Sequence, residues 1–164
     1  MYNVCKAGRN KSDRAIKSLA SKGGVIGICF FPPFIKMNEK TYEVLPSTIE
    51  DVLNHIEYAV NLVGVDYVAF GSDLTDWGLG TDEHGLQKCP PESSLRGWKK
   101  RRPDVFGKGS LEYYDPFPLG LQSHSTFINL SRGLVSRGFK EDEIKKILGG
   151  NILNLYKKVW DKSF

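Results

Sequence analysis

The chain has 164 residues, of which 40% are hydrophobic and 26% charged, with a formal net charge of +4. This composition is typical of one folded domain and excludes a collagen, a coiled coil or a disordered chain. It also excludes a membrane-spanning helix, because the longest apolar stretch, residues 23–35, contains two prolines and is shorter than the ~20 residues that such a helix needs.

The charge distribution and the cysteine content argue against several further classes of protein. The basic excess is concentrated in residues 99–102 and in the C-terminal lysines, and we interpret it as a solvated surface rather than a nucleic-acid site. Residues 1–13 are polar throughout and do not resemble a secretory signal. Three cysteines without a C-x-x-C spacing indicate neither a disulfide framework nor a cysteine zinc site. We therefore expect a reducing, cytoplasmic location.

The first half of the chain predicts alternating helices and strands. A helix capped by Ser12 or Asp13 should end at the glycine pair 23–24, and the apolar run 25–30 should form a strand buried on both faces, ended by the proline pair 32–33. A second helix, capped at residues 47–48, carries apolar residues at helical spacing from Ile49 to Val63 and stops at Gly64. A second buried strand follows at residues 67–71. This order is typical of βα units and a parallel sheet.

The second half predicts a long irregular stretch and then helices. Residues 74–122 show no periodicity and are rich in Gly, Pro, Asp and aromatic residues, which is typical of an active-site loop. Three short amphipathic helices are expected at residues 125–136, 140–148 and 151–160.

Two strands cannot protect both edges of a parallel sheet. Strands that are apolar on both faces need neighbours on each side. We therefore interpret residues 1–164 as a single partial domain, a portion of a larger α/β fold.

Asp73 and Arg9 are the residues that the pattern singles out for chemistry, each with an alternative. Asp73 directly follows the second strand, and side chains at the carboxyl end of a parallel strand point into the active-site mouth of such folds. The sequence Gly71-Ser72-Asp73 is equally typical of a turn or a helix cap. Arg9 precedes a helix start and could bind a carboxylate in a bidentate fork, or it is a surface cation.

Other polar clusters favour structural roles. The carboxylate and imidazole group of Asp76, Asp82, Glu83 and His84 matches no established metal spacing. His124 lies beside two serines without an orienting acid, which favours a helix cap over a nucleophile's base. His55 is expected on the helix as a partly buried or surface residue. The segment from Trp98 to Arg102 offers one aromatic residue beside a basic run, which is insufficient for a nucleic-acid binder.

Four segments in order resemble the C-terminal part of the membrane (renal) dipeptidase family of zinc peptidases. They are residues 9–13 (Arg-Asn-Lys-Ser-Asp), 23–28, 70–73 (Phe-Gly-Ser-Asp) and 148–153 (Leu-Gly-Gly-Asn-Ile-Leu). The resemblance implies the last two βα units and terminal helices of a (β/α)₈ TIM-like barrel that holds two Zn²⁺ ions and hydrolyses dipeptides. It implies that Arg9 binds the substrate carboxylate, and that Asp73 is catalytic, holding the water or the free amine and moving a proton.

The sequence also departs from the family. The family's zinc ligands, a His-x-Asp, a glutamate and two histidines, cannot be placed on this chain, so its metal-ligand set is predicted to be none. The family's Asn-Phe-Tyr is replaced by Cys29-Phe30-Phe31.

The chain alone is therefore expected to be inactive, with a homodimer or the missing N-terminal half as possible partners. The alternatives are a non-catalytic interaction protein derived from the barrel and a related metal-dependent amidohydrolase.

Overall fold

A pair of short parallel strands lies at the centre of the computed structural model, which describes residues 1–74, 102–108 and 117–160. Strand β1 (Ile26–Ile28) pairs with β2 (Val68–Phe70) in the register Ile26 to Val68 and Ile28 to Phe70. The α/β class and the parallel pairing are confirmed. Both strands are shorter than predicted, and closure of a barrel stays a prediction.

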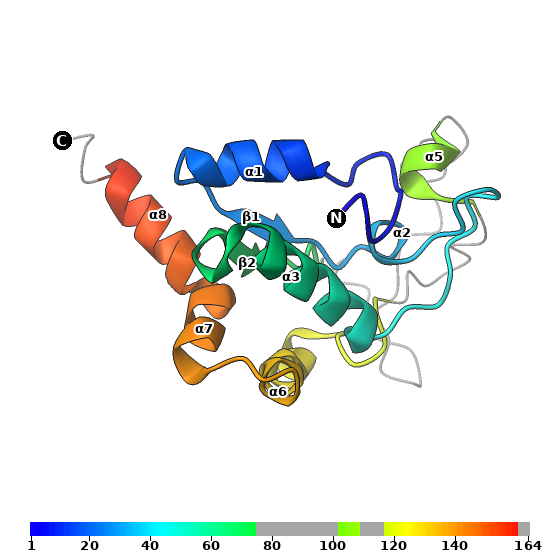
Figure 1. Cartoon of the computed structure of the whole chain (residues 1–164). Helices are drawn as coiled ribbons and strands as arrows, with labels where there is room; N and C mark the ends of the chain where they lie inside the picture. Colours follow the sequence, from blue (N-terminus) through cyan, green and yellow to red (C-terminus); the bar gives the residue numbers. More distant parts are fainter. Residues whose placement is uncertain (75–101, 109–116, 161–164) are drawn as a thin grey trace.

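Helices α1 and α3 contact the strand pair and begin at their predicted caps. In α1 (Asp13–Ser21), the Ser12 hydroxyl accepts a hydrogen bond from the backbone of Ala15. Helix α3 (Ile49–Val63) begins after Thr48, whose backbone N–H donates to the Asp51 carboxylate at 2.9 Å. Gly64 ends α3 with a φ of 91°, a left-handed conformation that favours glycine. Figure 1 shows α1 above the strands and α3 in front of them.

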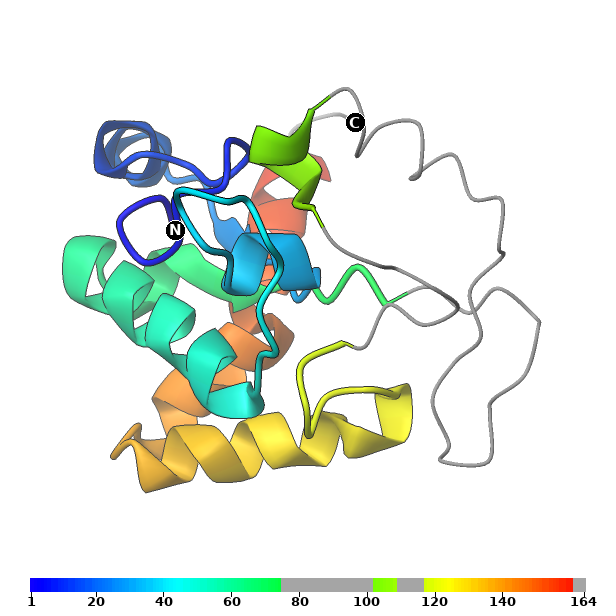
Figure 2. The same cartoon turned by 90° about the vertical axis from the view of Figure 1, so that its right-hand side faces the viewer.

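Two short helices were not predicted. One begins where we expected the first strand to end, and the other lies in the stretch expected to be irregular. The prolines predicted to end the first strand instead begin α2 (Pro32–Ile35), because proline fits the first helical positions, where no backbone donor is needed. Helix α5 (Pro103–Phe106) begins with proline too and lies within the stretch predicted to be irregular. The two helices lie side by side in Figures 1 and 2.

The C-terminal helices follow the predicted order. They are the short helical turn η2 (His124–Phe127), α6 (Ile128–Ser136), α7 (Glu141–Lys145), the turn η3 (Lys146–Gly150) and α8 (Asn151–Trp160). A further short turn, η1 (Val65–Tyr67), leads into β2. Gly149 has a φ of 152° and turns the chain between η3 and α8. None of the described helices has the length and apolar character needed to traverse a bilayer.

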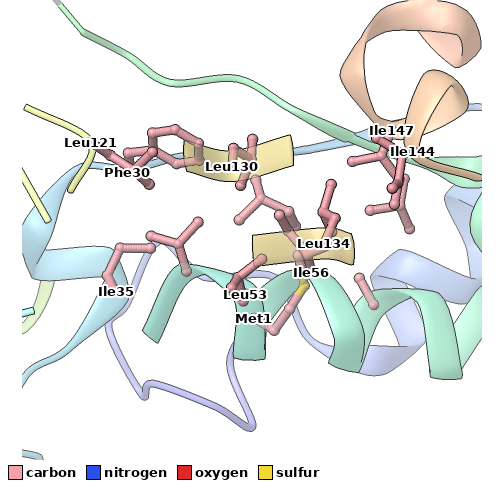
Figure 3. Packing of buried hydrophobic residues seen from close by; sticks show 14 of the residues in the cluster. Met1, Phe30, Ile35, Leu53, Ile56, Leu121, Leu130, Leu134, Ile144 and Ile147 are labelled. Atoms are coloured by element: carbon pink, nitrogen blue, oxygen red, sulfur yellow. The ribbon is translucent and has the colours of Figure 1, made fainter. Parts of the chain in front are cut away.

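The core lies between the helices and one face of the strands. Its members include residues of α3, α6 and the segment after β1, which meet in one cluster in Figure 3. Gly27, in the middle of β1, is exposed. The expectation that the first strand is buried on both faces is therefore wrong at Gly27, whereas the successive residues Val68 and Ala69 of the second strand are both buried.

His55 is fully buried, which corrects the expectation of a partly buried or surface residue. It shares the inner face of α3 with Leu53 and Ile56, and only 1% of it is exposed. Burial is tolerated because both ring nitrogens have partners. Nδ1 lies 2.6 Å from the Met1 amino group, and Nε2 lies 3.0 Å from the Ile35 carbonyl oxygen. Burial lowers the pKa of His55 to about 4 and that of the Met1 amine to about 6.

We predict that the free energy of unfolding decreases as the pH falls from the ordinary histidine pKa of 6.5 toward about 4. In this window the unfolded chain binds a proton at His55 that the folded chain excludes, which amounts to about 3 kcal/mol for the full shift. The Met1 amine acts in the same direction at higher pH, between its ordinary pKa of 8.0 and about 6. Urea unfolding at pH about 7 and about 5 measures the slope. His55→Asn should reduce it, with the exposed His124→Asn as the control, and an unchanged slope in His55→Asn would contradict the assignment.

Candidate active site

The carboxyl ends of the two strands bring Cys29 and Asp73 together. The parallel hydrogen bonding continues past the strands, because the Gly71 N–H donates to the Ile28 carbonyl at 2.9 Å and the Phe30 N–H to the Ser72 carbonyl at 3.2 Å. Cys29 thus lies opposite Gly71, and its thiol lies 3.8 Å from Oδ2 of Asp73, two residues farther along the chain from Gly71. The register of the strands therefore determines this contact.

Asp73 adopts a left-handed backbone conformation, with a φ of 57°. Aspartate and asparagine are among the few residues other than glycine that adopt it readily, and strained positions of this kind concentrate at functional sites. The following turn is held by the Ser72 hydroxyl, which accepts from the Leu74 N–H at 3.3 Å. The exposed Asp73 side chain thus leaves the strand end in a defined direction, with its carboxylate against Cys29.

Arg9 lies near the same thiol. Its guanidinium carbon is 5.8 Å from the centre of the Phe34 ring in α2, within the range of a cation–π contact. Arg9 is exposed, but its charge reaches Cys29, where it favours the thiolate and so opposes the effect of Asp73. Arg9 and Asp73 therefore act on the pKa of Cys29 in opposite directions, with Arg9 the weaker of the two.

The Cys29 thiol remains protonated at neutral pH in these surroundings. Its pKa is raised to about 11, first by burial and then by the Asp73 carboxylate, both of which disfavour a thiolate. The Phe31 N–H points at the sulfur from 3.4 Å. A neutral thiol can donate to the carboxylate but is a poor nucleophile.

An apolar wall lies beside these polar groups. Phe31 and Val105 are buried together, and Cys29 and Phe34 pack against them. Val105 belongs to α5, which is attached to the N-terminal segment through a hydrogen bond of 2.9 Å from the Gly8 N–H to the Asp104 carbonyl. A described part of the stretch 74–122 is thus packed against the segment that carries Arg9.

The remaining predicted candidates lie elsewhere. Asp76, Asp82, Glu83, His84 and Trp98 fall outside the described residues. His124 is not a cap, because Ser123 occupies that position and pairs with Thr126, while the His124 ring packs against Phe127. A flanking hydroxyl is the better cap because its oxygen reaches the free backbone donors of the first turn.

Metal ligands do not come together in the part of the chain that the structure describes. Residues 1–74, 102–108 and 117–160 contain no group of three His, Cys, Asp or Glu side chains placed to hold an ion. Zinc needs three or four convergent protein ligands, so Cys29 and Asp73 alone do not fit such a site.

Sequence reasoning missed Cys29 and Phe34 as members of this site. Cys29 lies at the carboxyl end of the first strand, the same end of the sheet at which Asp73 follows the second, and this is the signal that could have indicated it. Phe34 carries no such signal, because its place under Arg9 depends on the unpredicted helix α2.

These features define a class: an α/β protein with its polar groups at the carboxyl ends of parallel strands, where such proteins bind their ligands. A family model described as membrane dipeptidase (peptidase family M19) matches residues 1–89, which include Arg9, Cys29 and Asp73. The chain belongs to this family, and the resemblance stated above is confirmed.

Solved structures share the fold over nearly the whole chain. An amidohydrolase from Pseudomonas aeruginosa is 31% identical with a TM-score of 0.67, and the match covers 98% of this chain and 43% of that one. The dipeptidase AC, described as a metallopeptidase of family M19, is 18% identical with a TM-score of 0.64, over 97% and 35% of the two chains.

Curated dipeptidases also match nearly the whole of this chain but only part of their own length. The dipeptidase ataJ of Aspergillus terreus is 28% identical over 153 residues, which are 93% of this chain and 27% of that protein. The chain spans about a quarter of the length of the curated relatives that it matches, 26% to 27%.

We predict that Asp73→Asn accelerates alkylation of Cys29. Removing the carboxylate charge removes one of the two main influences that raise the thiol pKa, so the thiolate fraction and the rate with iodoacetamide should increase several-fold near pH 8. Mass spectrometry of digested protein measures each cysteine separately, and the buried Cys5 is the internal control. Equal rates for Cys29 in both proteins would show that Asp73 does not act on the thiol.

Proposed function

We propose that this chain supplies the part of a metal-dependent dipeptidase that binds the two charged ends of the substrate. The observation that supports the proposal is the placement of Arg9 and Asp73, with opposite charges, around Cys29 at the carboxyl edge of the strands. The guanidinium offers paired N–H donors that match a carboxylate, and the Asp73 carboxylate accepts hydrogen bonds from an ammonium group.

Two such groups at one edge favour short substrates. The amine and carboxylate of an extended dipeptide are about 7 Å apart, and each further residue adds about 3.5 Å. A longer peptide that bound Arg9 through its carboxylate would carry its amine past Asp73. In this proposal Asp73 is the catalytic residue that holds the amine or the attacking water and accepts a proton, while Arg9 sets the position of the scissile bond.

The metal chemistry is assigned to residues outside the described part of this chain. The family relation implies a metal, and we propose two zinc ions held by ligands from the remainder of a complete enzyme. A bound metal supplies an activated water in such enzymes. Because the described residues do not form a metal site, the proposal gives this chain substrate binding and the Asp73 proton, with no metal-dependent step of its own.

A second candidate is a non-catalytic interaction protein. It is favoured by the apolar side chains that α8 exposes, each 46% to 60% accessible: Leu153, Tyr156, Val159 and Trp160. A hydrolase of other amide bonds is the third candidate, in line with the similarity to the amidohydrolase from Pseudomonas aeruginosa.

We predict that the isolated chain binds zinc weakly and hydrolyses no dipeptide. A chimera in which this chain replaces the matching segment of the dipeptidase AC should bind zinc and hydrolyse a dipeptide. Zinc titration and hydrolysis of a simple dipeptide measure the two properties. Robust turnover by the isolated chain would show that it needs no further metal ligands. A chimera that folds and binds zinc but hydrolyses no dipeptide would contradict the proposed function. It would favour the second candidate, a non-catalytic interaction protein.

We predict that Asp73→Ala and Arg9→Glu affect different constants in the chimera. Asp73→Ala should lower kcat by several orders of magnitude with little loss of zinc, because it removes the group that moves the proton. Arg9→Glu should chiefly raise KM, because it removes carboxylate binding in the ground state and the transition state alike. A peptide amide, which lacks the carboxylate, is the matched control for Arg9. Near-normal kcat in Asp73→Ala, or an unchanged preference for a free carboxylate in Arg9→Glu, would remove the residue from its role.

A further inference from the structure

The segment that carries Arg9 is irregular but is held firmly in place. Ala7 is fully buried and Cys5 is 4% exposed, although Arg9 between them and α1 lies on the surface. The backbone turns tightly here, since the Asn10 N–H donates to the Ala7 carbonyl at 2.9 Å. Without strand or helix hydrogen bonds, the segment depends on other contacts for a single conformation.

The Asn10 side chain provides two of these contacts. Its Nδ2 atom donates to the Cys5 carbonyl and to the Phe34 carbonyl, each at 2.8 Å. The first bond closes the turn from residue 5 to residue 10. The second attaches that turn to α2. Both N–H groups of the amide are used, and the half-buried side chain bridges two stretches of backbone that have no regular pairing with one another.

The second bond fixes the surface on which Arg9 lies. Phe34 gives its backbone carbonyl to Asn10 and its ring to the Arg9 guanidinium, at 5.8 Å. Asn10 therefore holds the neighbours on both sides of the cation: the backbone next to Arg9 and the aromatic residue beneath it. A flexible arginine loses conformational entropy when it binds an anion, and an arginine held in place beforehand loses less.

We propose that Asn10 is a positioning residue for Arg9. Through its two hydrogen bonds it keeps the guanidinium on the Phe34 ring, ready for a carboxylate ligand. The ligand class rests on the function proposed above, whereas the positioning of Arg9 stands on the contacts of Asn10 alone.

Asn151 offers a matched control. We call an asparagine amide that donates to two backbone carbonyls a clamp, and Asn151 forms a second one. Its Nδ2 donates to the carbonyls of Val65 and Val68, at 2.7 and 2.8 Å, so it makes the same pair of bonds to backbone. Val68 begins β2, which places this clamp at the amino end of the strand, away from Arg9. A purely structural role for Asn10 predicts that Asn10→Ala and Asn151→Ala affect Arg9 alike.

The first experiment follows the Nε–H resonance of Arg9 by NMR in the whole chain, assigned through its loss in Arg9→Lys. The Phe34 ring shifts this resonance, and Phe34→Leu gives its position without the ring. Asn10→Ala and Asn10→Asp, which keeps the shape but has no N–H donors, should both move it toward the Phe34→Leu position. Asn151→Ala should leave it in place. A wild-type resonance in folded Asn10→Ala, or an equal displacement in Asn151→Ala, would overturn the proposal.

The second experiment titrates the same resonance with acetylglycine, which has a free carboxylate, and with acetylglycine amide, which does not. Saturable binding of the acid by the wild type should weaken about tenfold in Asn10→Ala and remain unchanged in Asn151→Ala. Equal affinities in all three proteins would overturn the positioning role. No response of the wild type to the acid would contradict carboxylate binding by Arg9, and with it the proposed function, while the first experiment still decides the role of Asn10.

Discussion

The parallel pairing of β1 and β2 is the constraint on which the site depends. The register that joins Ile28 to Phe70 continues through the Gly71 and Phe30 hydrogen bonds, and it places Cys29 opposite Gly71, two residues before Asp73. A shift of one residue would reverse the face of each side chain and separate the thiol from the carboxylate. Ile28 and Val68 of the two strands belong to the same apolar cluster as the buried residues of α3 and α6, so core packing and site geometry have the same origin.

The electrostatics of the edge follow from the same geometry. Cys29 lies between an anionic and a cationic residue, yet its thiol stays neutral because burial and Asp73 outweigh Arg9. The resulting arrangement is a weak hydrogen-bond donor next to a carboxylate, instead of a nucleophile. The resemblance places Cys29 where the dipeptidase family has an asparagine. The thiol of Cys29 can donate a hydrogen bond as the asparagine amide does, although sulfur is a weaker donor than nitrogen.

Local signals predicted much of this fold, and contacts between distant residues account for what they missed. Ser12, Thr48 and Gly64 act through neighbours a few residues away, so their caps and stops could be read from the sequence. The burial of His55 could not, because its partners are Met1 and Ile35, on separate parts of the chain. At the site, the place of Asp73 after a strand was predictable from the strand. The pattern around Arg9 fits a carboxylate-binding arginine and a surface cation equally, because its surroundings come from Phe34 in the unpredicted helix α2.

Side-chain amides take over the work of backbone pairing where the chain enters and leaves the strand pair. At the carboxyl edge, Asn10 joins the turn before α1 to α2; at the amino end, Asn151 joins the kink at Gly149 to the start of β2. The carbonyl groups that they bind are partly or wholly removed from water, and the side-chain amides satisfy them there. Asparagine can serve two carbonyls at once from a short side chain, with little conformational entropy to lose. The Asn10 side chain lies next to Arg9 in sequence, and this is how a loop without secondary structure can hold its cation in a defined place.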